Sequence, residues 1–116
     1  MAKNYKVRDY SLYLDDILES TGKILAYVKG MSFERFSKDD KTIDAVVRNF
    51  EILGEASRQL PREFNEKHSQ VEWQDIYAFR NIIIHEYFGI DLKIIWDIIK
   101  TKLPALRLKI KKILGK

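Results

Sequence analysis

Apolar residues recur at alternating spacings of three and four along almost the whole chain of 116 residues. Side chains at these spacings share one face of an α-helix, whereas a half-buried strand would need strict alternation. The first stripe predicts a long helix that ends near Gly30, because glycine readily takes the left-handed conformation that follows a helix. Its members are Val7, Tyr10, Leu14, Ile17, Thr21, Ile24 and Val28, and Tyr13 and Leu25 widen it.

A second helix is expected to begin at Asp39 or Asp40, because a carboxylate there accepts hydrogen bonds from the free amides of the first turn. A linker or short helical turn with Phe33 and Phe36 precedes it. The buried face of the second helix is expected to consist of Ile43, Val46, Val47, Phe50, Leu53, Ser57 and Leu60.

Pro61 marks the end of this pattern. It either ends the second helix or opens a short one through Phe64, because the fixed φ of proline suits the first turn of a helix. Residues 65–70 are polar and are interpreted as a loop.

Two further long helices are expected. The third runs from about residue 72 to residue 88, and its core candidates are Trp73, Ile76, Tyr77, Ile83 and Ile84. Gly89 should end it, Asp91 should cap the last helix, and Pro104 should bend that last helix by removing an amide and crowding the preceding turn. The apolar positions of the last helix are Leu92, Ile95, Trp96, Ile99, Leu103, Leu106, Ile110 and Ile113.

No stretch of four or more residues alternates strictly enough to predict a strand, and no repeat or linker divides the chain. We therefore expect one all-α domain over residues 1–116, an antiparallel bundle of four long helices with a possible short extra helix.

Composition excludes several classes of function. The chain has no cysteine, so disulfides, thiolate zinc sites and cysteine nucleophiles are excluded, and its two histidines show no metal-site spacing with acidic residues. The N-terminal lysines and arginine precede no apolar stretch, and no apolar run approaches the length that spans a bilayer. A soluble, cytoplasmic protein without a membrane partner is expected, and its net charge of +4 favours nucleic acid only slightly.

The segment from Arg80 to Tyr87 collects a guanidinium, an amide, an imidazole and a phenol within eight residues. On a helix, Arg80 and Tyr87 share a face two turns apart, and Asn81 and His85 are neighbours on an adjacent face. Arg80 and His85 are about 140° apart around the axis, so one straight helix does not bring them together. Their long side chains could lean into a shared groove, or a second protomer could supply the missing half.

This segment resembles the motif of the HepT-like branch of the HEPN superfamily, an arginine and asparagine followed by His-x-Tyr: Arg80-Asn81-x-x-x-His85-Glu86-Tyr87. The resemblance covers nearly the whole chain and implies a HEPN-like helical bundle. Further positions that look like those of the family are Gly54-Glu55-Ala56, Trp73, Gly89-Ile90-Asp91, Ile95-Trp96 and Leu103-Pro104.

The resemblance implies an endoribonuclease that needs no metal or other cofactor and works as a homodimer, with the motifs lining a cleft between protomers. RNA cleavage by its own 2′-hydroxyl needs a base, an acid and positive charge on the phosphorus centre. His85 titrates near neutrality and can serve as base or acid, while Arg80 can hold phosphate oxygens through paired donors. Asn81 is expected to orient His85 or to donate to phosphate, and is about equally suited to a structural role.

The resemblance also implies that the chain is the toxin of a type VII-like toxin–antitoxin pair. A partner nucleotidyltransferase antitoxin of the MNT type would transfer AMP onto Tyr87 and so block Arg80. The alternative is a catalytically silent HEPN module for nucleotide binding or assembly. A third interpretation makes the chain the partner of a nucleotidyltransferase that modifies another molecule.

Other residues leave alternatives open. Glu55 is either a partner for Arg80 across the bundle or a surface carboxylate, and His68 is expected to be solvated in its polar loop. Trp73 and Trp96 are interpreted as core residues rather than platforms for nucleobases. The C-terminal lysines and arginine from Lys100 onward are either a track for RNA phosphates or, as we prefer, a solvated helix face.

Overall fold

Helices make up most of the chain in its computed structural model, which describes residues 10–85 and 91–116, without the side chains of residues 82–85. Over these ranges no strand is present, and no helix is both long and apolar enough to cross a membrane. The helices are α1 (Ser11–Tyr27), α2 (Phe33–Ser37), α3 (Asp40–Arg58), α4 (Arg62–Lys67), α5 (Trp73–His85), α6 (Leu92–Thr101) and α7 (Leu103–Leu114).

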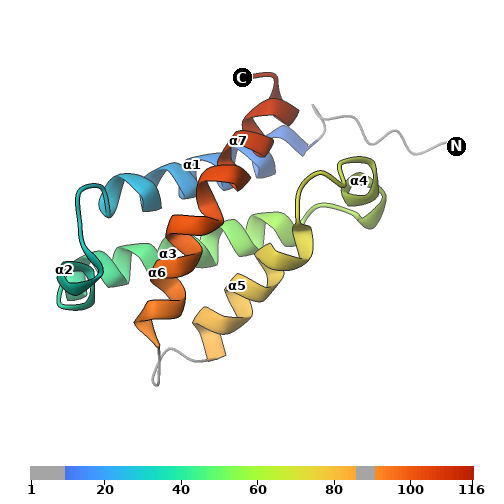
Figure 1. Cartoon of the computed structure of the whole chain (residues 1–116). Helices are drawn as coiled ribbons and strands as arrows, with labels where there is room; N and C mark the ends of the chain where they lie inside the picture. The colour runs from blue at the N-terminus through green and yellow to red at the C-terminus, as the bar shows by residue number, and fades with distance from the viewer. Residues whose placement is uncertain (1–9, 86–90) are drawn as a thin grey trace, which may run out of the picture.

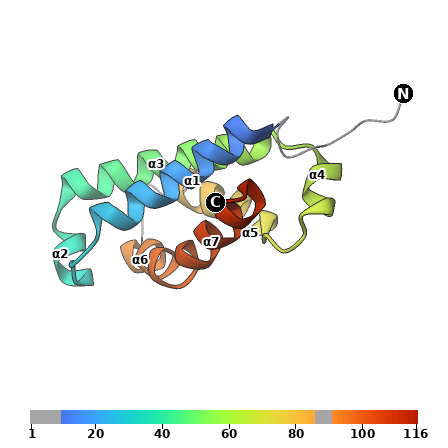
Figure 2. The same ribbon diagram turned by 90° about the horizontal axis from the view of Figure 1, so that it is seen from above.

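The helices form two layers. Helices α1 and α3 lie side by side in one layer, and α5, α6 and α7 cover one face of that pair (Figures 1 and 2). Helix α7 packs on α1, α5 packs on α3, and α2 contacts both α3 and α6. The short helices α2 and α4 lie at opposite ends of the α1–α3 pair (Figure 1). The prediction of an all-α bundle of long helices is therefore confirmed.

Local signals mark three of the predicted helix boundaries. The carboxylate of Asp39 accepts a hydrogen bond from the Thr42 backbone N–H at 3.0 Å, and this bond holds the pKa of Asp39 below its ordinary value. The carboxylate of Asp91 accepts from the Lys93 backbone N–H at 3.0 Å. Gly30 has a φ of +78°, which requires glycine in the turn after α1.

The expected last helix differs from the prediction, because it is two helices rather than one bent helix. Helix α6 ends at Thr101 and α7 begins at Leu103, with Pro104 in its first turn. The carbonyl of Lys102 accepts from the Leu106 backbone N–H at 3.1 Å, so a new set of helical hydrogen bonds starts there. Proline has no N–H to continue the older set, and in a first turn that N–H would have no partner within the helix.

The expected loop at residues 65–70 is also partly wrong, because α4 continues to Lys67. Phe64 is fully buried and anchors this short helix, and Arg62 Nε donates to the carboxylate of Glu66 at 3.0 Å one turn later. A polar composition is therefore compatible with a helix here.

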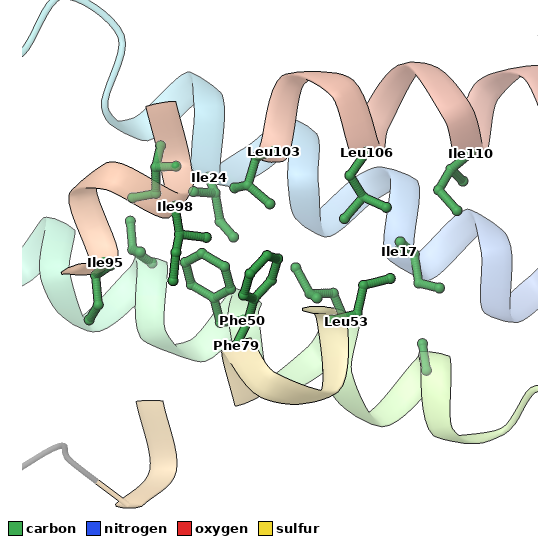
Figure 3. Close-up of a cluster of buried hydrophobic side chains, with 14 of the residues drawn as sticks. Ile17, Ile24, Phe50, Leu53, Phe79, Ile95, Ile98, Leu103, Leu106 and Ile110 are labelled. Carbon is green, nitrogen blue, oxygen red and sulfur yellow. The ribbon is translucent and has the colours of Figure 1, made fainter. Parts of the chain in front are cut away.

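The core lies between the two layers, where side chains from α1, α3, α5, α6 and α7 meet (Figure 3). All seven positions expected on the buried face of the second helix are buried. Phe79 is a core residue that the predicted list omits, and its ring contacts Phe50 edge to face with centroids 6.2 Å apart. This contact fixes α5 against α3.

Candidate functional site

The side chain of Arg80 lies directly on the backbone of α3 at Gly54. A Cβ atom added to Gly54 would stand 2.7 Å from Arg80 Cδ and 2.9 Å from Arg80 Cβ. Real Cβ contacts are essentially never that short, so a side chain on residue 54 would displace either Arg80 or α5. The absence of a side chain at residue 54 therefore determines how closely Arg80 approaches α3.

Glu55, the next residue of α3, holds the end of the same side chain. Arg80 Nη2 and Glu55 Oε1 are 2.5 Å apart, and the Arg80 side chain is 24% exposed whereas that of Glu55 is 52% exposed. Arg80 Nε is buried and has no hydrogen-bond partner among the described residues. The alternative in which Glu55 partners Arg80 across the bundle is confirmed as a contact, and its role in activity stays a prediction.

Arg80 lines two hollows on the surface. The first, which we call the α1–α3 hollow, includes Asp16, Arg48, Glu51 and Glu55 in its lining. The second, which we call the Arg58 hollow, is lined by Arg58, Tyr77, Arg80 and Asn81. The guanidinium of Arg80 is thus within reach of molecules in either hollow.

Helical spacing explains why three residues of α5 line the Arg58 hollow together. Tyr77, Arg80 and Asn81 are three and four residues apart and share one face of α5. The side-chain amide of Asn65 on α4 donates to the Tyr77 hydroxyl at 3.0 Å, which fixes the phenol at the edge of the hollow. Asn81 is exposed there, in a position suited to contact a ligand.

Arg58 lines the second hollow, and the sequence interpretation does not include it. It lies three residues after Glu55 on α3, and its Nη1 is 3.6 Å from Glu55 Oε1, the oxygen that also pairs with Arg80. The i,i+3 spacing of Glu55 and Arg58 indicates this pair, but only the approach of α5 shows that a second arginine shares it.

The remaining motif residues lie at the edge of the described structure. Helix α5 extends through His85, one turn beyond Asn81, and the side chain of His85 lies outside the described residues. Tyr87 lies entirely outside them, as does Gly89. The convergence of these groups with Arg80 stays a prediction.

His68 differs from the expectation that it is solvated. Its ring packs on the ring of Phe64 with centroids 4.5 Å apart, and its Nε2 is buried without a hydrogen-bond partner among the described residues. Burial, and to a smaller degree the charge of Lys67, lowers the pKa of His68. Its backbone carbonyl accepts from Trp73 Nε1 at 3.0 Å, so His68 joins α4 to α5.

The two tryptophans are core residues, as expected, since Trp73 and Trp96 are 6% and 7% exposed. The basic C-terminal segment is partly neutralised by acids of other helices. Lys102 lies 3.8 Å from an Asp75 carboxylate oxygen, and Lys109 lies 3.9 Å from one of Glu72. These contacts favour the interpretation as a helix face over that as a phosphate track.

Comparison with known proteins identifies the family. The family model described as "Ribonuclease HepT-like" matches residues 17–113 of this chain. No solved structure matches the chain at a significant level.

Several relatives resemble the chain over nearly its full length. A "Putative RNase" of Caldanaerobacter subterraneus subsp. tengcongensis is 47% identical over 90% of this chain and 93% of its own. A "Putative RNase" of Methanocaldococcus jannaschii is 43% identical over 84% of this chain and 80% of its own. The "Probable ribonuclease HepT" of Thermococcus cleftensis is 37% identical over 91% and 96%. The chain therefore belongs to the HepT-like ribonuclease family.

Proposed function

We propose that this chain is the toxin of a type VII-like toxin–antitoxin pair and acts as a metal-independent endoribonuclease. Its membership of the HepT-like ribonuclease family supports RNA as the substrate. The observation that supports the site assignment is the position of Arg80. Glu55 pairs with its guanidinium, its stem lies against Gly54, and the side chain lines a surface hollow. A fixed guanidinium of this kind can bind phosphate oxygens through paired donors.

In the proposed reaction the RNA 2′-oxygen attacks the adjacent phosphorus atom, and the bond from phosphorus to the 5′-oxygen breaks. A base takes the proton of the 2′-hydroxyl, and an acid gives a proton to the departing 5′-oxygen. Arg80 stabilises the charge on the phosphoryl oxygens. The products are a 2′,3′-cyclic phosphate and a free 5′-hydroxyl, and Asn81 orients His85 or donates to the phosphate.

One histidine cannot act as base and acid in the same step, and each chain supplies one motif. We propose that the protein acts as a homodimer in which the His85 of each protomer takes one of the two roles. A heterodimer with one His85→Ala subunit should then lose most activity. Near-full activity of that heterodimer would contradict the division of roles.

Tyr87 is proposed as the acceptor of AMP from a partner nucleotidyltransferase. On a helix it would share a face with Arg80, so the added phosphodiester would compete with the substrate phosphate for that guanidinium. Coexpression with the nucleotidyltransferase should add the mass of one adenylyl group to wild-type protein and not to Tyr87→Phe. Equal modification of both proteins would exclude Tyr87 as the acceptor.

The test of the function uses purified protein whose mass shows Tyr87 to be unmodified. It is incubated with a mixed RNA pool in the presence of chelator, beside His85→Ala. Cleavage by the wild type alone, with cyclic phosphate ends, is expected. Absence of cleavage would favour the alternative of a silent module that binds nucleotides or assembles with a nucleotidyltransferase.

A further inference from the structure

Two arginines share one carboxylate at the edge of α3. Glu55 Oε1 lies 2.5 Å from Arg80 Nη2 and 3.6 Å from Arg58 Nη1. Within the described ranges neither arginine forms an ion pair with any other acidic group. Two positive charges therefore face one negative charge, and the cluster has a net charge of +1.

The excess positive charge faces only one of the two hollows that Arg80 lines. The α1–α3 hollow is lined by three carboxylates, those of Asp16, Glu51 and Glu55, against the guanidiniums of Arg48 and Arg80. The Arg58 hollow is lined by two guanidiniums and, among the described residues, by no acid. An anion at Arg80 is therefore favoured in the Arg58 hollow and opposed in the α1–α3 hollow.

Neutral donors complete the Arg58 hollow. Tyr77 lines the hollow, where its hydroxyl lies 3.0 Å from the side-chain amide of Asn65, and a hydroxyl can donate as well as accept a hydrogen bond. Asn81 contributes a side-chain amide with two further donors, and Arg58 is 56% exposed and able to turn toward a ligand. Two guanidiniums, a hydroxyl and an amide form a set of donors suited to phosphate oxygens.

We propose that the Arg58 hollow is a subsite for a phosphodiester group of the RNA strand, with Arg58 as a phosphate-binding residue beside Arg80. The inference rests on the proposed function, which it extends with a second point of contact for the substrate. The subsite lies one turn of α5 before His85, so the phosphate it holds is the one that is cleaved or one close to it in the strand.

Arg58→Gln tests the subsite, and Arg48→Gln is its matched control. Both arginines are exposed residues of α3, and each pairs with an acid three residues away, Arg48 with Glu51 at 3.8 Å. Only Arg58 lines the proposed subsite. Thermal unfolding of both variants should match that of wild type, since neither side chain is buried.

The measurement is the affinity for a 2′-O-methyl oligoribonucleotide, which carries phosphodiesters but has no 2′-hydroxyl to attack. Arg58→Gln should bind it about tenfold more weakly, the usual effect of losing one hydrogen bond to a charged group. The slope of log affinity against log salt should fall by about 0.7, the value for one phosphate contact on a single strand. Arg48→Gln should bind like wild type, and Arg58→Lys should recover part of the affinity as a point charge.

Three outcomes would overturn the subsite: no binding by wild type, unchanged binding by Arg58→Gln, or equal losses in the two glutamine variants. The last would show a general effect of charge. RNA cleavage is measured separately, so the two proposals fail independently. Binding that depends on Arg58 without any cleavage would refute the ribonuclease and retain the subsite, whereas cleavage with binding that does not depend on Arg58 would refute only the subsite.

Discussion

Gly54→Ala reverses the usual effect of replacing a glycine within a helix. Alanine favours the helix over glycine by about 1 kcal/mol, so the substitution would ordinarily stabilise α3. Here the new Cβ would lie 2.7 Å from Arg80 Cδ and 2.9 Å from Arg80 Cβ. A different Arg80 rotamer relieves the first contact but not the second, because Cβ is fixed to the backbone of α5. Helix α5 must therefore move away from α3.

The expected cost follows from this movement. Overpacking of this kind costs about 1–3 kcal/mol, which offsets the gain in helix propensity and leaves a net loss of up to about 2 kcal/mol. Gly22→Ala on α1 is the matched control, since its Cβ would meet only the mobile end of Arg107, with Nε at 3.3 Å. It should gain up to about 1 kcal/mol. The difference between the two variants isolates the contact and should be about 1–3 kcal/mol.

Urea unfolding, monitored by far-UV circular dichroism, measures the free energy of unfolding of both variants. Their thermal midpoints should differ by about 4 °C per kcal/mol for a domain of this size. In an Arg80→Ala background, which removes Cγ and Cδ, part of the cost of Gly54→Ala should disappear. If Gly54→Ala stabilises the protein as much as Gly22→Ala does, Arg80 does not lie against Gly54 and the site geometry is wrong.

Three further predictions concern stability. Burial lowers the pKa of His68 in the folded state. The contribution of His68 to stability is therefore present above its ordinary pKa of 6.5 and is lost as the pH falls through the folded value. His68→Gln should therefore flatten the decline in thermal midpoint between about pH 7.5 and pH 5. The pKa of Asp39 is also lowered, so its contribution to stability is likewise lost as the pH falls. Asp39→Ala should therefore lower the thermal midpoint at neutral pH. A difference in midpoint between wild type and Asp39→Ala that persists unchanged under strongly acidic conditions would argue against the cap. Trp73→Phe removes the donor to the His68 carbonyl and should cost about 1 kcal/mol in urea unfolding, whereas an unchanged midpoint would show that the bond contributes nothing.

The helices could be predicted from the sequence because their signals are local. The buried stripe of α3 follows from spacings of three and four, and Asp39 caps its start through an amide only three residues away. Gly30 lies in the turn after α1 because its own φ is positive, a conformation that glycine adopts readily. Pro104 predicts an interruption, but whether the helix bends or restarts depends on how both halves pack, which is a tertiary effect.

The environments of single side chains were harder to predict. The polar neighbours of His68 in the chain predict a solvated side chain, yet the ring of Phe64, one helical turn earlier, packs against the His68 ring. Phe79 follows Ile76 at a spacing of three, so the two share a face of α5, and both are buried. Spacing identifies the face of a helix, and only packing decides which element covers it.

The same distinction explains why the arginine of the motif cannot be understood from the motif alone. Residues 80 and 85 are about 140° apart around α5, so their spacing does not bring their side chains together. The position of Arg80 is set from α3, where Gly54 gives room for its stem and Glu55 binds its end. A chain with the same motif on α5 but a larger residue at position 54 should therefore hold its arginine differently. The Gly54-Glu55 pair is as much a part of the proposed site as the motif itself.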